Sequence, residues 1–228
     1  MSVSLRLKVR YVLALCLATA ASIGLLLAEA ISSHGFSGLY LYLLWNLFLA
    51  WIPFILSVWL VYMLHRKNWS SWGGLALSAG WLAFLPNSFY MISDFIHLPE
   101  VEPGQLLLSV VVFTSFIYTG VLLGLGSLYL IHTELNKRLS NRSSAFVVAI
   151  LLLACSIAIY IGRDLRWNTW DVLANPAGML FDLSERLLHP TQYPQALAVI
   201  VPFFVLLLSM YAVAWQTARL FAARPSDD

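Results

Sequence analysis

A short segment of mixed polarity, residues 85–98, carries the first side chains that could do chemistry. Pro86 has no backbone N–H, so we expect the helix to kink or restart there, with Pro86 in the first turn of a new helical piece. At helical spacing, four polar residues then fall at i, i+3, i+7 and i+10 and share one face: Asn87, Tyr90, Asp94 and His97.

A second polar segment, residues 162–171, follows a long apolar run. If a helix continues through it, Asp164, Asn168 and Asp171 form one polar stripe at i, i+4 and i+7. An adjacent stripe carries Arg163, Arg166 and Trp170. Both segments leave the membrane on the same predicted side, so their polar groups can converge.

These residue types support binding or catalysis. Asp94 and His97 have the spacing of metal ligands, and Asp164 and Asp171 would add oxygen ligands for a divalent cation as cofactor. The candidate catalytic residues are Asp94, His97 and Asp171, with Asp94 or His97 as general base. The candidate ligand-binding residues, whose two arginines would clamp a phosphate or carboxylate, are Asn87, Tyr90, Arg163, Arg166, Trp167, Asn168 and Trp170.

Three roles stay open for these residues. In a structural role, Asp94 pairs with Arg163 or Arg166 and joins the third and fifth helices. As a membrane-embedded enzyme, the protein would act on a lipid or envelope precursor. A small-solute transporter is disfavoured, because the middles of the apolar runs hold Ser and Thr but no Asp, Glu, Lys, Arg or His.

The amino-acid composition indicates that the chain is surrounded by lipid. Of the 228 residues, 61% are hydrophobic and only 11% are charged, against about 50% and about 25% in soluble domains. Together with a mean hydropathy of +0.81, this excludes a water-soluble globule. The net charge of +2 gives no support for a nucleic-acid partner.

Six apolar runs are long enough to cross a bilayer as helices. They are approximately Tyr11 to Ile31, Leu39 to Leu64, Trp72 to Ile92, Leu106 to Ile131, Ala145 to Ile161 and Gln195 to Phe221. We therefore predict an all-α, polytopic protein that forms a single integral membrane domain over residues 1–228, with the lipid bilayer as its partner. The oligomeric state is left open.

The basic residues predict the orientation. Ten Lys and Arg residues fall on one side of these spans, and the other side holds only Arg163, Arg166 and Arg186. The positive-inside rule then places both termini in the cytoplasm of a bacterial inner membrane and the polar segments outside. A cleaved signal peptide ending near Ala28-Glu29-Ala30 is the competing interpretation, although the apolar run is longer than in such signals.

A shorter helix is predicted between the fifth and sixth spans. Asn175 and Pro176 are a helix start, and Pro190 is a stop. The segment is too short to span the membrane, so we expect an interfacial helix on the outer leaflet, with Leu180, Leu183 and Leu187 along one side. It would either cover the polar site or only connect two spans.

The polar segments also carry a family resemblance. Leu85-Pro86-Asn87 with Tyr90, Asp94 and His97-Leu98, and Gly162-Arg163 with Arg166-Trp167-Asn168 and Trp170-Asp171, resemble a bacterial family of multi-pass membrane proteins catalogued as domain of unknown function thirteen sixty-one. The stretch from Trp45 to Ala50 supports the resemblance. The family supplies no established activity, so the chemistry rests on the residues alone.

Overall fold

The computed structural model describes residues 3–32, 38–66, 68–101, 103–165, 174–189 and 191–222. Every regular element in these ranges is helical. The elements are α1 (Val3–Ser32), α2 (Gly38–Leu64), α3 (Trp72–Tyr90), the 3-10 helices η1 (Met91–Glu100) and η2 (Pro103–Gln105), α4 (Leu106–Asn136), α5 (Asn141–Arg163), α7 (Pro176–Leu188) and α8 (Pro194–Ala222).

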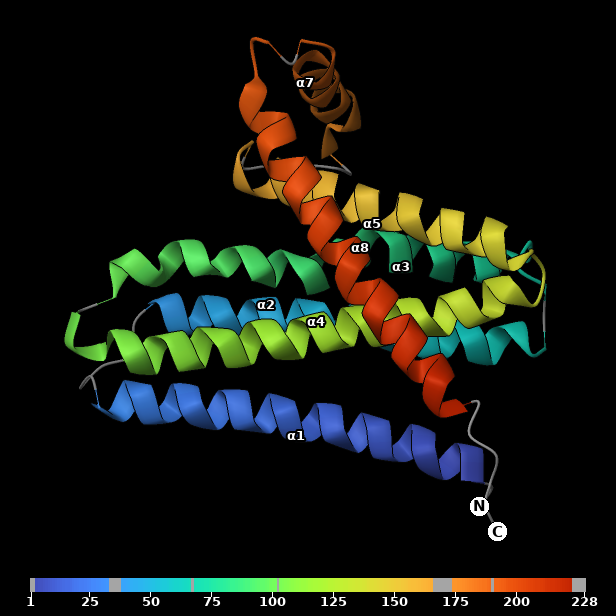
Figure 1. The fold of residues 1–228 in the computed structure, drawn as a ribbon, viewed down its shortest axis with the longest axis horizontal. Coiled ribbons are helices and arrows are strands. Elements are labelled where there is room, and N and C mark those ends of the chain that lie inside the picture. Colours follow the sequence, from blue (N-terminus) through green and yellow to red (C-terminus); the bar gives the residue numbers. More distant parts are fainter. Residues whose placement is uncertain are drawn as a thin grey trace. The chain divides into compact units, whose positions relative to one another are not determined.

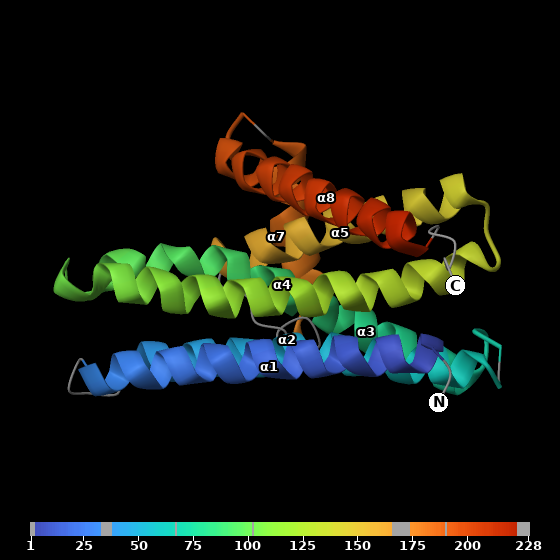
Figure 2. The ribbon, with the colours of Figure 1, turned by 60° about the horizontal axis from the view of Figure 1, so that its bottom comes forward.

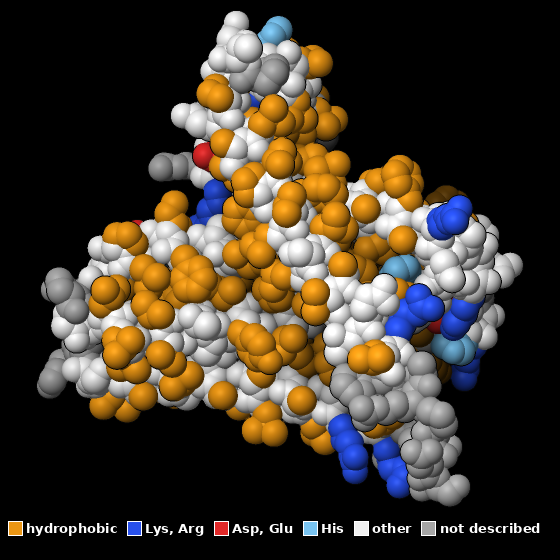
Figure 3. Space-filling model, viewed as in Figure 1, with side chains coloured by type: hydrophobic (Ala, Val, Ile, Leu, Met, Phe, Trp, Pro, Cys, Tyr) orange, Lys and Arg blue, Asp and Glu red, His pale blue; other side chains and the backbone are white. Residues whose placement is uncertain are grey.

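Six of the described helical segments are long and apolar enough to cross a membrane, which confirms the predicted all-α polytopic architecture. They are Arg6–Ser32, Leu41–Leu64, Trp72–Glu100, Leu106–Asn136, Asn141–Arg163 and Pro194–Leu220. Even in the most buried of them, within α4, only 50% of the most hydrophobic window is buried inside the protein. Much of the remaining apolar surface is exposed, as the orange side chains of Figure 3 show, and it is suited to contact with lipid.

The chain divides into two compact units, Met1–Ser127 (unit 1) and Leu128–Asp228 (unit 2). In unit 1, α1, α2, α3 with η1, and the first part of α4 run alongside one another (Figures 1 and 2). The end of this unit where α1 stops and where α2 and α4 begin also holds η1, and we name it the Asp94 end. Unit 2 contains the last turns of α4 together with α5, α7 and α8.

Hydrogen bonds from small hydroxyl side chains join the helices of unit 1. Ser88 Oγ donates to the carbonyl of Ala50, 3.2 Å away, and Ser127 Oγ donates to the carbonyl of Pro53, 3.1 Å away. Pro53 lies inside α2, where it removes one backbone hydrogen bond. The two hydroxyl bonds go to carbonyls in the same part of α2 and attach it to α3 and α4, and α2 crosses unit 1 as one helix.

The predicted restart of the helix at Pro86 is wrong, whereas a kink there stays a prediction. Helix α3 continues through Pro86 to Tyr90, and the change of geometry comes at Met91, where η1 begins. Pro86 removes only its own N–H from the helix, and Asn87 Nδ2 donates to the carbonyl of Phe84 within the same turn, 3.2 Å away. The packed neighbours of α3 hold the remaining backbone bonds in place.

Unit 2 contains the short helix predicted after the fifth span. Asn175 Oδ1 accepts a hydrogen bond from the Gly178 amide, 3.0 Å away, and Pro176 is the first residue of α7, so the predicted start is confirmed. Leu183 packs against a buried cluster on α5 and α8, whereas the side chains of Leu180 and Leu187 are exposed. The location of α7 at a membrane surface stays a prediction.

Two glycines of α4 allow α3 to approach closely in unit 1. A Cβ atom at Gly124 would lie 2.8 Å from Ser88 Cβ and 2.9 Å from Phe89 Cζ, and one at Gly120 would lie 3.2 Å from the Ser88 carbonyl oxygen. Such distances are too short for carbon atoms in van der Waals contact. The glycines therefore set the spacing of α3 and α4 just before η1.

We expect Gly124→Ala to lower the free energy of unfolding by about 1–3 kcal/mol, because the added methyl group overpacks the α3–α4 contact. Gly24→Ala on α1 is the matched control, since a Cβ there meets nothing within 4 Å. That control should be neutral or stabilising by up to about 1 kcal/mol, as alanine is the better helix former. Thermal unfolding in detergent measures both; equal effects of the two changes would contradict the close packing.

Candidate functional site

Asp94 is the centre of the polar residues in unit 1. Its side chain is fully buried, and both carboxylate oxygens accept hydrogen bonds from α2. Tyr42 Oη donates to Oδ1 at 2.9 Å, and Asn46 Nδ2 donates to Oδ2 at 3.0 Å. A buried carboxylate is stable only with such partners, so these bonds fix both Asp94 and the register of α2 against η1.

Helix α2 presents both donors because Tyr42 and Asn46 are four residues apart and share one helix face. Tyr42 is not among the site residues predicted from the sequence, and Asn46 entered only as part of the stretch that supports the family resemblance. The available signal was the pair itself, since an amide and a phenol at i and i+4 in an otherwise apolar run are suited to a polar partner on a neighbouring helix.

The 3-10 geometry of η1 arranges the other polar side chains. With three residues per turn, side chains at i and i+3 eclipse each other, so Met91, Asp94, His97 and Glu100 form one ridge. Exposure rises along this ridge: Met91 and Asp94 are 0% exposed, and the side chains of His97 and Glu100 are 24% and 64% exposed. The ridge therefore leads from the interior of unit 1 to its surface.

His97 connects the buried and exposed parts of this ridge. Its Nδ1 atom lies 2.9 Å from Glu100 Oε1, and its ring packs edge-on against the Tyr42 ring, with 5.2 Å between centroids. Tyr42 thus contacts both Asp94 and His97. The result is a chain of four side chains from two helices: Asp94, Tyr42, His97 and Glu100.

The other predicted residues of the first segment take less direct positions. Asn87 is half-buried, and its side-chain amide donates to the carbonyl of Phe84 in its own helix. Tyr90 is half-buried at the junction of α3 and η1, where its carbonyl accepts a hydrogen bond from Ser93 Oγ at 2.5 Å. Asp94 and His97 are the two predicted residues that the described contacts bring together.

The second predicted segment is described only at its beginning. Helix α5 ends at Arg163 with Asp164 as its C-cap, so the predicted continuation of the helix does not hold at this point. Desolvation raises the pKa of the Asp164 carboxyl above its ordinary value, although the residue is exposed. The remaining predicted residues lie outside the described ranges: Arg166, Trp167, Asn168, Trp170 and Asp171.

A metal site stays a prediction. Among the described residues, no three His, Cys, Asp or Glu side chains form a group that could hold a metal ion. Asp171, one of the four predicted ligands, lies outside those residues. The pairing of Asp94 with Arg163 or Arg166 likewise stays a prediction.

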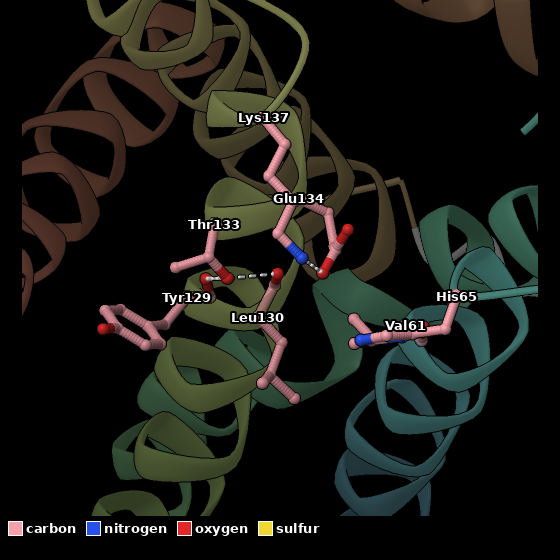
Figure 4. A network of polar contacts seen from close by, with 7 residues as sticks. All are labelled: Val61, His65, Tyr129, Leu130, Thr133, Glu134 and Lys137. Atoms are coloured by element: carbon pink, nitrogen blue, oxygen red, sulfur yellow. Dashed lines mark hydrogen bonds and ion pairs between the residues drawn. The ribbon is translucent and has the colours of Figure 1, made fainter. Parts of the chain in front are cut away.

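A different polar cluster, which the sequence analysis missed, lies in unit 2. His132 is buried, its Nδ1 lies 2.8 Å from Tyr211 Oη, and its ring stacks on Trp215 with 3.9 Å between centroids. Lys137, the first residue after α4, donates from Nζ to Glu134 Oε1 at 2.5 Å, as Figure 4 shows. Glu134 is thus a buried acid in the last turn of α4 that is paired with a lysine three residues later.

Comparison with known proteins identifies the family of the chain. The model of the family "Protein of unknown function (DUF1361)" matches residues 45–210, which is most of the chain. The chain belongs to this family. No curated protein and no solved structure matches it. The matched region contains Asn46, Asp94 and His97, whereas Tyr42 precedes it.

The family description names no activity, so the chemistry of the site has to be inferred from its geometry. A fixed carboxylate can accept hydrogen bonds or attract a cation, and an imidazole beside a second carboxylate can accept and release a proton. Both groups lie on one ridge of η1. The Asp94 end of unit 1 is therefore suited to binding a polar group that reaches it from the membrane surface.

We expect Tyr42→Phe to lower the free energy of unfolding by about 1.5–3 kcal/mol, the range for a hydrogen bond to a charged group. The change removes one donor to Asp94 and retains the ring that packs against His97. Tyr62→Phe on the same helix is the control, because Tyr62 is 59% exposed. Thermal unfolding compares them, and an unaffected Tyr42→Phe protein would show that the bond does not stabilise the fold.

Proposed function

We propose that this integral membrane protein binds the polar headgroup of a lipid or envelope precursor at the Asp94 end of unit 1. The ridge of η1 carries this proposal, because it leads from the buried Asp94 to the exposed Glu100. The neighbouring residues Phe95 and Ile96 are 39% and 65% exposed, so apolar surface suited to lipid adjoins the ridge. A lipid headgroup lies at just such a boundary between apolar and polar surface.

The ridge favours a headgroup that carries hydrogen-bond donors. Its polar side chains are two carboxylates and one imidazole, which are mainly acceptors near neutral pH. An ammonium or hydroxyl group of a headgroup would complement them. Arg163 and Arg166 stay our candidates for the phosphate of the same headgroup, on the sequence argument alone.

The proposed orientation places the Asp94 end outside and both termini in the cytoplasm of a bacterial inner membrane. The support is the distribution of basic residues: Arg6, Lys8 and Arg10 lie at the start of α1, and Arg66 follows the end of α2. Both positions are opposite to the Asp94 end. In Figure 3, Lys and Arg side chains are visible at the end of α1 where the chain begins.

Lipid retention tests this function. Native mass spectrometry of the purified protein with phosphatidylethanolamine and phosphatidylglycerol should show preferential retention of phosphatidylethanolamine, because the carboxylates of the ridge attract its ammonium group and the exposed Glu100 can accept a hydrogen bond from it. Asp94→Asn should reduce that preference about tenfold, equivalent to about 1.4 kcal/mol. Asp182→Asn, the same chemical change on α7, should leave it unaltered.

Size-exclusion chromatography checks folding of each variant. A folded Asp94→Asn protein with unchanged lipid preference would contradict the proposed site. Failure of Asp94→Asn to fold, together with a wild type that retains both lipids equally, would favour a purely structural role for Asp94.

A second candidate function is catalysis, which the His97–Glu100 contact favours. If Nδ1 donates its proton to Glu100, Nε2 becomes the basic nitrogen of His97. A carboxylate that orients a histidine in this way is a common arrangement for a general base. The protein would then modify the headgroup that it binds.

For an enzyme, His97→Gln should lower the rate of product formation from phosphatidylethanolamine by about 100-fold or more, and lipid retention far less, because glutamine keeps a hydrogen-bond acceptor on the ridge. His65→Gln is the control, since His65 is an exposed histidine at the other end of α2 whose Nδ1 bonds locally to the Val61 carbonyl (Figure 4). Mass spectrometry of the lipid extract measures the product. Equal rates in the two variants would exclude His97 as the base.

A further inference from the structure

Unit 1 contains a second buried acid, Glu29, which has no part in the proposed headgroup site. It lies in the last turn of α1, at the Asp94 end, and only 2% of the residue is exposed. Leu15, Ser22, Leu26 and Ala30 are buried on the same helix. Glu29 therefore belongs to the side of α1 that packs into unit 1, although most of that helix is exposed to the surroundings.

Only one of the two oxygens of the Glu29 carboxyl group has a hydrogen-bond partner among the described residues. Ser109 Oγ, which is fully buried near the start of α4, donates to Glu29 Oε1. Glu29 Oε2 has no partner, and it is the one buried side-chain nitrogen or oxygen in the described part of the chain of which this is true. A carboxylate needs hydrogen-bond donors at both oxygens, whereas a carboxylic acid carries its own proton on one of them.

The described cations of unit 1 are far from Glu29. Arg10 is the nearest basic residue on α1, and nineteen residues of helix at 1.5 Å each separate the two by about 28 Å. Arg66 follows α2 at the opposite end of that helix from its start. Among the residues that the structure describes at the Asp94 end, the titratable side chains near η1 are Asp94, which accepts hydrogen bonds from Tyr42 and Asn46, and His97, which contacts Glu100.

Glu134 provides the contrast within the same chain. It is also buried, 5% exposed, but Lys137 neutralises it in an ion pair. Glu29 has one neutral donor in place of a cation. Burial of an ionised carboxylate under those conditions is strongly unfavourable, and a neutral acid is the form that such surroundings stabilise.

We propose that Glu29 is a proton-binding site within the membrane-spanning part of the protein. It holds a proton on Oε2 while Oε1 accepts the hydrogen bond from Ser109. The site is independent of the headgroup proposal, since it lies on α1 and α4 and uses none of the ridge residues.

A hydrophobic carbodiimide, dicyclohexylcarbodiimide, detects a carboxylic acid in a membrane. The acid O–H adds across one C=N bond: the carboxyl oxygen bonds to the central carbon, and the proton goes to a nitrogen. The acyl group then migrates to nitrogen, and nothing leaves, so the peptide gains the mass of one carbodiimide molecule. We expect peptide mass spectrometry to find this adduct at Glu29 and not at the ion-paired Glu134.

Glu29→Gln is the matched variant, because a carboxamide has the shape and neutrality of the protonated acid. It should abolish the adduct and leave the unfolding temperature of the protein unchanged. The second measurement is an infrared difference spectrum at neutral pH, in which the spectrum of the Glu29→Gln protein is subtracted from that of the wild type. It should contain the carbonyl band of a protonated carboxyl group. Absence of that band, or a marked fall in the unfolding temperature of Glu29→Gln, would overturn the proposal.

Discussion

The Asp94 carboxylate has to be solvated by protein groups, because it is fully buried in a helical unit whose outer surface is apolar. In such surroundings an unpartnered carboxylate costs more free energy than most single contacts supply. Tyr42 and Asn46 meet this requirement from α2, and they meet it only in one register of α2 against η1. A slide of either helix by one turn would break both bonds. This single requirement thus fixes the relative position of two membrane-spanning segments, which nonspecific apolar contacts would leave less defined.

The rest of the Asp94 end is arranged around this bond. Gly120 and Gly124 bring α4 close to the last turns of α3, so the chain enters η1 from a tightly packed position. The change to 3-10 geometry at Met91 then aligns every third side chain. Six residues make two complete turns of an ideal 3-10 helix, so Asp94 and Glu100 lie on the same side of its axis. In an α-helix the same six residues would place these two side chains about 120° apart around the axis. The ridge from Asp94 to Glu100 is therefore a product of backbone geometry as much as of residue type.

The sequence was sufficient for the spans, because length and apolarity are strong signals. It also singled out Asp94 as an isolated acid beside an apolar run, and the functional roles of Asp94 and His97 stay predictions. It was insufficient for Tyr42, since the i, i+4 pair of Tyr42 and Asn46 marks a polar face of α2 but does not state that this face meets η1. The error at Pro86 has a related cause. A proline removes one hydrogen bond locally, but whether the helix ends there depends on packing by neighbouring helices, which lies outside the local pattern. Helix α5 ends at Arg163, so the shared faces that helical periodicity predicts for residues 163–171 do not follow from a continuation of α5, because periodicity places residues on one face only while a helix continues.

The described buried acids are stabilised in two different ways, by an ion pair or by hydrogen bonds from neutral side chains. Glu134, near the end of α4, is neutralised by Lys137 one turn later, where basic residues are frequent in the sequence. Asp94 and Glu29 lie at the end of unit 1 that is opposite to its described Lys and Arg, and each receives hydrogen bonds from neutral side chains. Among the described contacts, both oxygens of Asp94 accept a hydrogen bond, whereas Glu29 accepts one at Oε1 alone. An oxygen without a donor is the difference that favours a proton on Glu29, although both side chains are almost completely buried.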